Sequence, residues 1–410
     1  MVSVVAKRMQ FAAARTGWPD APAGRDVVLH TRVVTGTGGG PDKTILMSAA
    51  HLAQSNYWLA AAYMHPPDDP GFDTIRQRAA AYGSPLISVP DKGPLDRGVL
   101  RQMLALCRHY NVRIWHGHDY KSNLIGLLLR PFWSMKLVTT VHGWVRRTAR
   151  TPLYYAVDRW SLPYYHHVIC VSQDLVDRVR GLNVPAERCT YVPNAVDHQR
   201  FARRGRACDA AMREAVGTPA GRLVVGAVGR LSAEKGFNLL IRTVRALVDE
   251  GHDLELWIAG EGDGHDELVK LIAHLGLADR VRLLGFVEDT VALYEAMDLF
   301  VLSSLREGLP NVVLEAMSMG VTVVSTEVAG VPGLVVDEQT GLLCPIADQA
   351  ALTEAVRRGV ADERLRASLA SAARSLIERE YSFAVRMQRV RAIYDRVLAD
   401  EPASPRDAEP

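Results

Sequence analysis

Short apolar runs, nearly continuous in Val, Ile and Leu, alternate with amphipathic helical stretches along most of this sequence. Buried parallel strands have this composition because both of their faces are covered. The alternation of strands and helices therefore predicts parallel sheets with helices on both faces. Strands are predicted at 27–34, 57–63, 85–89, 112–118, 136–141 and 167–172, and in the second half at 222–228, 253–259, 280–285, 298–303 and 321–326.

The two groups of strands predict an α/β protein with two Rossmann-like, doubly wound domains that face each other across a cleft. A chain of 410 residues is long enough for two domains of ordinary size. The expected parts are an N-terminal extension (1–24), an N-terminal domain (25–193), a linker with a short helix (194–221), a C-terminal domain (222–380), a helix that can pack back across the junction (381–398) and a disordered tail (399–410).

Composition excludes several classes of protein. Lys and Arg number 48 against 46 Asp and Glu, a net charge of +2, which gives no nucleic-acid footprint. The five cysteines are scattered without CxxC spacing, as expected of buried thiols in a reducing compartment. The N-terminal residues do not have the pattern of a signal peptide, so none is expected, and the sequence contains no run of about 18 apolar residues that could span a membrane. A cytoplasmic protein is therefore expected.

The stretch "TGTGGGPDKT" (35–44) follows the first predicted strand and nearly spells a phosphate-binding loop. A P-loop would need glycines where Thr37 and Asp42 stand, and a dinucleotide fingerprint would need one near Pro41. Both patterns fail. A flexible loop that touches a phosphate or sugar at a strand end remains, and a tight strand–helix turn fits equally well.

Two cations follow the strand predicted at 222–228. Arg230 and Lys235 lie in "GRLSAEKGFNLL" (229–240), between that strand and the next helix. An Arg fork and a Lys point charge at the carboxyl end of a strand can neutralise a diphosphate. A solvated surface pair is about equally consistent with this motif alone.

The segment "SSLREGLPNVVLEAMSMG" (303–320) predicts an anion seat at a helix start. Pro310 suits the first position of a helix and Gly320 its end. Free backbone amides at a helix N-terminus bind phosphate, with the helix dipole behind them. The amides expected to do so belong to Gly308, Leu309, Asn311 and Val312.

Two carboxylates flank this seat. Glu307 lies in the loop before the helix, and Glu315 lies in the apolar setting "VVLEAM" on the helix itself. A carboxylate can accept hydrogen bonds from paired hydroxyls of a ribose or a hexose. A half-buried Glu315 would need such a partner, whereas the alternative is an ordinary charge on the helix surface.

These motifs together resemble a family 4 glycosyltransferase of GT-B architecture. The resemblance rests on "GRLSAEKGF", "AGEGDG" (259–264), "LGFVED" (284–289), the Glu307–Glu315 pair and "STEVAGVPGLV" (325–335). It is near continuous over 189–380 and looser over 25–188, where "TGTGGGPDKT", "WHGHDYKSN", "TTVHGW" and "VICVS" keep the expected order. Asn194-Ala195 and Gly333 depart from the family's usual Asn-Gly and Glu.

The resemblance implies a role for each candidate residue. Positions matching Arg230 and Lys235 bind the donor diphosphate, and Glu315 matches the ribose-binding carboxylate. Glu307 and His142 match residues beside the donor sugar near the reacting carbon and the leaving phosphate. The remaining matches are Gly39 and Gly40 near the donor phosphate and acceptor, and Gly260, Gly262, Phe286 and Val287 around the nucleobase.

The implied activity is retaining transfer of a sugar, of hexosyltransferase type, from a nucleotide diphosphate sugar to a glycan, lipid-linked or small-molecule acceptor in polysaccharide or glycoconjugate biosynthesis. The sequence lacks a D-x-D motif, so neither a divalent metal nor another cofactor is expected. Asp42 and Asp119 are conceivable carboxylate nucleophiles without supporting geometry. The competing functions are a nucleotide-sugar epimerase of GT-B architecture, a sugar phosphorylase and a non-catalytic sugar-nucleotide binding protein.

The segment 145–165 combines four arginines, at 146, 147, 150 and 159, with five aromatic residues. A basic, aromatic helix can lie on an anionic bilayer. That would place the protein at the inner face of a membrane and favour a lipid-linked acceptor. A helix with aromatics in the core and solvated arginines is the alternative.

Overall fold

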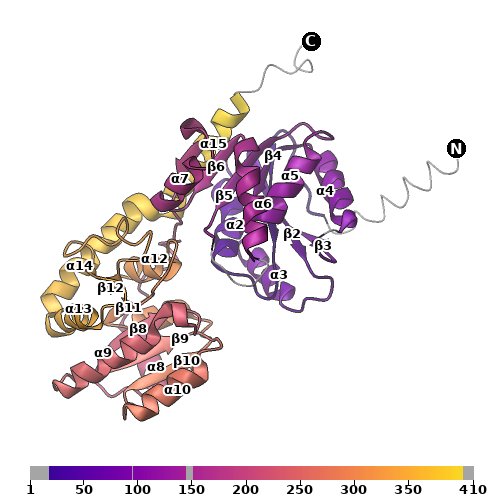
Figure 1. The fold of residues 1–410 in the computed structure, drawn as a ribbon. Coiled ribbons are helices and arrows are strands. Elements are labelled where there is room, and N and C mark those ends of the chain that lie inside the picture. The colour runs from indigo at the N-terminus through magenta and orange to yellow at the C-terminus, as the bar shows by residue number, and fades with distance from the viewer. Residues whose placement is uncertain (1–17, 95, 145–150, 400–410) are drawn as a thin grey trace, which may run out of the picture. The chain divides into compact units, whose positions relative to one another are not determined.

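A computed structural model describes residues 18–94, 96–144 and 151–399, except for the side chains of residues 151 and 206–209 (Figure 1). The described chain forms two compact units. Unit 1 contains the residues up to Val192 together with those from Met387 onward, and unit 2 contains Pro193–Arg386.

Unit 1 is built on a seven-stranded parallel sheet with the strand order β3-β2-β1-β4-β5-β6-β7. Its strands are nearly continuous in apolar residues, and helices cover them. The strands are β1 (Asp26–Val33), β2 (Tyr57–His65), β3 (Leu86–Pro90), β4 (Val112–Gly117), β5 (Lys136–Val141), β6 (His167–Cys170) and β7 (Cys189–Tyr191). The helices are α2 (Gly40–His51), α3 (Phe72–Ala81), α4 (Arg97–Tyr110), α5 (Tyr120–Leu129), α6 (Thr151–Ser161) and α7 (Gln173–Arg180), with short 3-10 turns η1 (Leu162–Tyr164) and η2 (Ala186–Arg188).

Unit 2 is built on a six-stranded parallel sheet with the order β10-β9-β8-β11-β12-β13. Its strands are β8 (Leu223–Val228), β9 (Leu254–Ala259), β10 (Val281–Gly285), β11 (Leu299–Leu302), β12 (Thr322–Thr326) and β13 (Leu342–Cys344). Its helices are α8 (Arg206–Val216), α9 (Phe237–Asp249), α10 (His265–His274), α11 (Thr290–Glu295), α12 (Asn311–Ser318), α13 (Gln349–Ala361) and α14 (Glu363–Leu376), with a 3-10 turn η3 (Ala233–Lys235) and a π-helical turn η4 (Ile377–Tyr381).

The predicted doubly wound parallel sheets are confirmed, and every predicted strand is present. The sequence pattern did not reveal β7 and β13, which have three residues each and lie at sheet edges. Strands this short carry too few residues to show a period, and edge strands need less apolar sequence than central ones.

Two segments near the expected domain boundaries take definite structure. The stretch 194–221 contains α8, which packs against α11 within unit 2. The last described helix, α15 (Phe383–Ala399), begins in unit 2 and continues from Met387 in unit 1. Within unit 1 it is held by Tyr394, which bonds His116, and by Asp395, which accepts from Tyr57 at 2.7 Å.

No helix within the described residues is both long and apolar enough to cross a membrane. Four of the five cysteines are buried free thiols, as their scattered spacing predicts: Cys107, Cys170, Cys189 and Cys344.

Candidate functional site

The site in unit 2 lies at the carboxyl ends of β8 and β11. The strand order reverses between these two neighbours. The chain continues from β8 to β9 and β10 on one side of β8, whereas β11, β12 and β13 lie on its other side. Open parallel sheets bind ligands at such switch points, where the loops after the two strands diverge. Those loops are residues 229–236 and 303–310.

Backbone contacts hold these two loops together. Gly236 has a φ of +63°, and a Cβ there would lie 2.1 Å from the Ser303 carbonyl oxygen. Only glycine fits both the conformation and the space. The Ser303 hydroxyl donates to the Lys235 carbonyl at 2.9 Å, and the Leu305 amide donates to the Glu234 carbonyl at 2.8 Å. The side chains that follow are therefore placed by a tight backbone junction.

Lys235 and Glu307 meet across this junction. The Lys235 Nζ lies 2.5 Å from the Glu307 Oε1, and the same oxygen accepts from the Ser304 hydroxyl at 2.8 Å. Both charged side chains keep some exposure, 20% for Lys235 and 15% for Glu307, so a ligand can reach them. Arg230, in the same loop as Lys235, is exposed and has no side-chain hydrogen bond or ion pair among the described residues.

The helix that follows Glu307 offers unpaired amides. Pro310 is the N-cap of α12, and the amides of Gly308, Leu309, Asn311 and Val312 donate to no acceptor within the described part of the chain. The first amides of a helix have no intrahelical partner, and an anion can satisfy them. The buried side-chain oxygens of Asn311 and Asn194 also lack a hydrogen-bond partner there. Asn194 itself donates to the Leu309 carbonyl at 3.3 Å, so it belongs to this seat.

Glu315 lies one turn further along α12 and is only 5% exposed. The Tyr294 hydroxyl donates to its Oε2 at 3.0 Å. Burial, followed by the nearby Glu315 charge, holds the pKa of Tyr294 well above its usual value, so this phenol keeps its proton and remains a donor. Glu315 is therefore a buried carboxylate with a fixed orientation, and the alternative of an ordinary charge on the helix surface is wrong.

The predicted nucleobase-bordering residues lie at the ends of the next two strands. Gly260 follows β9, and its amide donates to the Gly285 carbonyl of β10 at 2.7 Å. A Cβ at Gly260 would lie 1.9 Å from the Gly229 carbonyl oxygen, so glycine is required there. Beyond β10, Phe286 is 67% exposed, whereas Val287 packs partly against the core of unit 2.

In unit 1 the glycine loop begins α2. The Gly39 amide donates to the Asp42 carboxylate at 2.6 Å, so in this structure the amide is not available to a phosphate. Asp42 is 1% exposed and also pairs with Arg32 at 2.8 Å. The acidic residue that breaks the P-loop pattern thus caps the helix start. Gly40 is the first residue of α2.

Neither conceivable nucleophile is suitably placed. Asp42 is committed to the Gly39 amide and to Arg32. Asp119 caps α5 by accepting from the amides of Lys121 and Ser122, and it also accepts from the Val33 amide at 2.6 Å. Both carboxylates therefore hold the backbone together.

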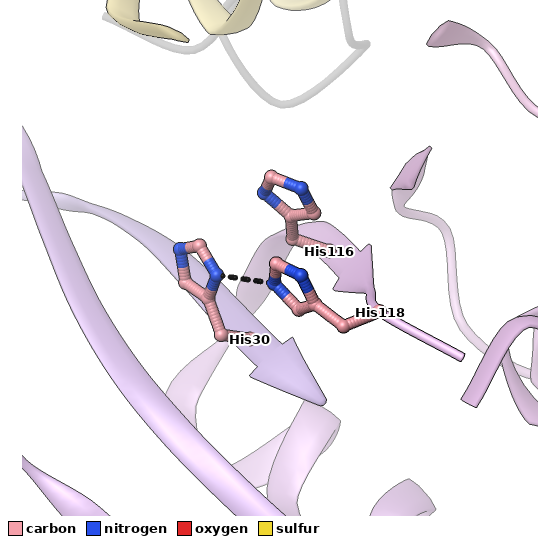
Figure 2. A group of neighbouring side chains, drawn as sticks. All are labelled: His30, His116 and His118. Carbon is pink, nitrogen blue, oxygen red and sulfur yellow. Dashed lines mark hydrogen bonds between the residues drawn. The ribbon is translucent and has the colours of Figure 1, made fainter. Parts of the chain in front are cut away.

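His142 directly follows β5 and joins a group of buried histidines that sequence reasoning did not single out. His30 on β1 and His116 on the adjacent β4 are register partners, and His118 lies just beyond β4. Their rings stack with centroids 4.5–5.1 Å apart (Figure 2). His118 bonds His30 at 2.8 Å and His142 at 3.1 Å. The only signal in the sequence was a histidine within the first predicted strand, in "VVLH", and two histidines at the end of the fourth, in "WHGH".

The ring nitrogens of His30, His116 and His118 all lie within 4.8 Å of one another, as in sites that hold a metal. Neutral imidazole is a good ligand for zinc, copper or nickel. A ligating histidine gives one nitrogen to the metal and donates from the other. Here both nitrogens of each ring already contact a hydroxyl or another histidine, so the rings form a hydrogen-bonded chain.

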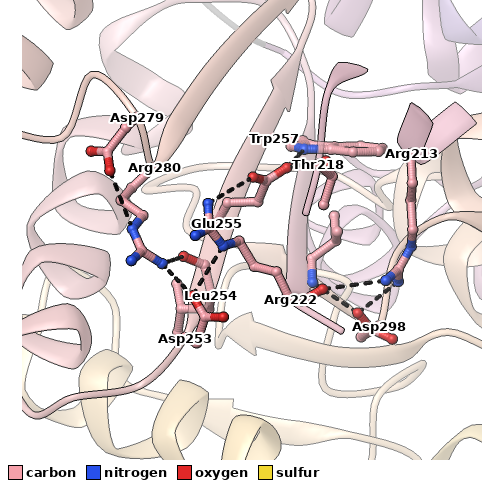
Figure 3. A network of polar contacts seen from close by, with 11 residues as sticks. Arg213, Thr218, Arg222, Asp253, Leu254, Glu255, Trp257, Asp279, Arg280 and Asp298 are labelled. Atoms are coloured by element: carbon pink, nitrogen blue, oxygen red, sulfur yellow. Dashed lines mark hydrogen bonds and ion pairs between the residues drawn. The ribbon is translucent and has the colours of Figure 1, made fainter. Parts of the chain in front are cut away.

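A charged network in unit 2 lies at the opposite edge of its sheet, where the strands begin (Figure 3). Its buried carboxylate is Glu255, which is fully buried and accepts from the Trp257 indole at 2.5 Å. Arg213 pairs with Asp298 at 2.7 Å, and Arg222 pairs with Asp253 at 3.0 Å. These contacts fasten the end of α8 and the segment after it to the sheet, and they lie at the amino ends of the strands, away from the carboxyl ends that carry the site.

Two family models match this chain. Residues 209–376 match the family described as glycosyl transferases group 1, and residues 38–200 match glycosyltransferase family 4. The alpha-D-kanosaminyltransferase of Streptomyces kanamyceticus is 33% identical over 363 residues, which cover 82% of this chain and 94% of that protein. The lipopolysaccharide core biosynthesis glycosyltransferase LpsE of Rhizobium meliloti is 33% identical over 235 residues, 57% of this chain and 64% of that protein.

Solved structures share the fold. HepE of Anabaena in complex with UDP superposes with a TM-score of 0.77 at 20% identity, covering 90% of this chain and all of that one. A glycosyltransferase of Rickettsia africae gives a TM-score of 0.78 at 17% identity, with 92% and 100% coverage. The chain belongs to the group 1, family 4 glycosyltransferases and is a glycosyl-transferring enzyme of GT-B fold.

Proposed function

We propose that this enzyme takes its sugar from a nucleotide diphosphate sugar bound in unit 2, and that it works with retention of configuration and without a divalent metal. The observation that carries the proposal is the Lys235–Glu307 pair beside four amides at the start of α12 that have no acceptor among the residues the structure describes. A cation and a helix N-terminus together suit a diphosphate. The UDP complex of HepE, a neighbour of the same fold, supports this donor class.

Breaking the bond between the anomeric carbon and the phosphate builds negative charge on the leaving group. Preorganised donors aimed at that charge lower the barrier. The donors are the side chains of Lys235 and Arg230 and the amides of Gly308, Leu309, Asn311 and Val312. Since Asp42 and Asp119 are both committed to structural contacts, the acceptor hydroxyl attacks the anomeric carbon on the face that the phosphate leaves, and its proton passes to the leaving phosphate. The acceptor is a glycan, a lipid-linked or a small-molecule acceptor in polysaccharide or glycoconjugate biosynthesis, in keeping with the role of LpsE in lipopolysaccharide core biosynthesis.

The test is a panel of UDP-, GDP-, ADP- and dTDP-sugars incubated with the full-length protein, with and without candidate acceptors. Release of nucleoside diphosphate that depends on an acceptor, persists in EDTA and gives a product with the donor's anomeric configuration is expected. Conversion of the donor sugar without an acceptor would instead identify an epimerase. Binding without release in any combination would identify a non-catalytic binding protein.

Glu315 gives a direct test of the ribose assignment. Replacing Glu315 with Gln keeps the shape but removes the charge. A hydrogen bond to a charged group contributes about 1.5–3 kcal/mol, so nucleoside diphosphate affinity should fall about 10- to 100-fold. Calorimetry with the normal nucleotide and with its 2′,3′-dideoxy analogue measures this. The analogue should bind both proteins with similar, weak affinity. An equal loss of affinity for both nucleotides in the variant would contradict the assignment.

We also propose that unit 1 docks on an anionic bilayer through a patch formed by the end of α5, the loop after it and the end of α6. Phe132, Trp160 and Tyr164 are 64%, 57% and 52% exposed, and Leu128 is 48% exposed. Trp160 and Tyr164 help line an open pocket of about 570 Å³, together with the cation Arg130. Exposed aromatics beside arginines suit an interface with acidic lipids. The arginines at 146, 147 and 150 lie outside the described residues.

Changing both Phe132 and Trp160 to Ser should weaken binding to phosphatidylglycerol-containing vesicles. Burying one large apolar side chain is worth about 1.5–3 kcal/mol, so the partition coefficient should fall at least about 10-fold. Flotation of the full chain with these vesicles measures it, and neutral vesicles report the contribution of charge. Phe286→Ser, which alters a comparably exposed aromatic in unit 2, is the matched control. Undiminished flotation of the double variant would rule out this patch.

A further inference from the structure

A continuous chain of hydrogen-bonded groups runs through unit 1 from Thr140 to His142. The Thr140 hydroxyl contacts His116 Nε2 at 2.7 Å, and His116 Nδ1 contacts the Tyr394 hydroxyl at 2.6 Å. That hydroxyl lies 3.4 Å from His30 Nε2. His30 Nδ1 then bonds His118 Nε2 at 2.8 Å, and His118 Nδ1 bonds His142 Nε2 at 3.1 Å.

The far end of the chain sets its direction. Thr140 is 1% exposed, and among the described residues its hydroxyl hydrogen has no acceptor other than His116 Nε2. A buried hydroxyl left without an acceptor is costly, so Thr140 donates. His116 Nε2 therefore accepts. A neutral imidazole carries one proton, and His116 must hold its proton on Nδ1.

The direction of each hydrogen bond then determines the direction of the next one. His116 Nδ1–H donates to the Tyr394 oxygen, and the Tyr394 hydroxyl donates onward to His30 Nε2. His30 holds its proton on Nδ1 and donates to His118, which in turn donates from Nδ1. Burial, followed by the surrounding histidines and Arg32, pushes the pKa of His118 well below its ordinary value, which keeps this link neutral.

We propose that Tyr394 and Thr140 are positioning residues that hold His142 as the neutral tautomer with its proton on Nδ1. In this state His142 Nε2 accepts from His118 and the ring donates through Nδ1–H; under the proposed function, the acceptor of that bond in the complex is a substrate oxygen. A doubly protonated His142 would direct Nε2–H against the Nδ1–H of His118, so the chain disfavours the cation. The inference rests on the proposed function only for the identity of that substrate oxygen.

The tautomer is read directly from ring ¹⁵N shifts of full-length protein labelled on histidine, with His142 assigned through a His142→Asn variant. Tyr394→Phe removes one hydroxyl from the middle of the chain. We expect the Nδ1–H form of His142 to fall from nearly complete to about half, since the remaining links then permit both directions. Thr140→Val removes the terminal donor and should produce the same change.

Tyr57→Phe is the matched control. The Tyr57 hydroxyl donates to Asp395, the neighbour of Tyr394 on α15. The Tyr57 ring packs edge-on against the Tyr394 ring, with the two ring centroids 5.5 Å apart. This variant loosens the same helix without touching a histidine, so the His142 tautomer should stay unchanged. An unchanged tautomer in folded Tyr394→Phe and Thr140→Val, or an equal change in Tyr57→Phe, would overturn the proposal.

Because these spectra are recorded without substrate, they are independent of the proposed donor. A tautomer shift in a protein that turns over no nucleotide sugar would uphold the chain and reject the proposed function. Normal turnover of a nucleotide sugar, together with an unchanged His142 tautomer in the variants, would uphold the proposed function and reject the hydrogen-bonded chain.

Discussion

Replacing Lys235 with Ala should lower the rate of sugar transfer about 10²–10³-fold while leaving the fold intact. Removal of one preorganised donor that faces developing negative charge has an effect of this size. Lys235 lies at the switch point of the unit 2 sheet, 2.5 Å from Glu307, with 20% of its side chain exposed. A partly exposed ion pair contributes about 1 kcal/mol or less to stability, so thermal unfolding should change little. Nucleoside diphosphate release measured against donor concentration gives the loss.

Lys270→Ala is the matched control, because this lysine is exposed on α10 and belongs to no part of the site. It should retain normal transfer. Lys235→Arg separates charge from shape: a planar fork cannot reproduce the point charge of an ammonium in a junction this tight, so only part of the rate should return. Near-normal sugar transfer by Lys235→Ala would contradict the assignment of the diphosphate-binding site to unit 2.

The fold follows from the sequence because central parallel strands are buried on both faces and must be continuously apolar. The strand at Lys136–Val141 begins and ends where its pattern predicts. The pattern fails where a strand has only three residues, as at β7 and β13. The stretch 194–221, predicted as a linker with a short helix, contains the helix α8, and Arg213 on α8 pairs with Asp298 just before β11. A polar sequence can still pack when its charges have partners.

The candidate site, like the fold, could be predicted from the sequence only in part. Topology alone brings the loops after β8 and β11 to one edge, which is why the stretch containing Lys235 and the stretch containing Glu307 could be combined from sequence. Their direct bond could not be predicted, because it depends on the close approach of Gly236 to Ser303. The hydrogen-bonded chain of histidines could not be predicted from the sequence for a different reason. It depends on the register that sets His30 opposite His116, and on Tyr394, which is distant in sequence.

Replacing Glu307 with Ala should also lower transfer about 10²–10³-fold, but two different causes predict that loss. Glu307 can contact the donor sugar, as the family resemblance implies, or it can merely hold Lys235 in place. Calorimetry with the nucleoside diphosphate alone separates them. If Glu307 contacts the sugar, the variant binds this sugar-free ligand nearly as well as the wild-type protein. If Glu307 only positions Lys235, the affinity falls as in Lys235→Ala.

Ser304→Ala is the control for loop geometry, since it removes the other hydrogen bond to the same carboxylate oxygen and leaves the charge. Its effect should be several-fold at most. The Lys235→Ala, Glu307→Ala double variant completes the cycle. Residues that act as one unit give losses that do not add, whereas a cation on the diphosphate and a carboxylate on the sugar should lose rate nearly independently. A double variant no slower than either single one would reduce Glu307 to a support for Lys235 and leave the sugar contact unassigned.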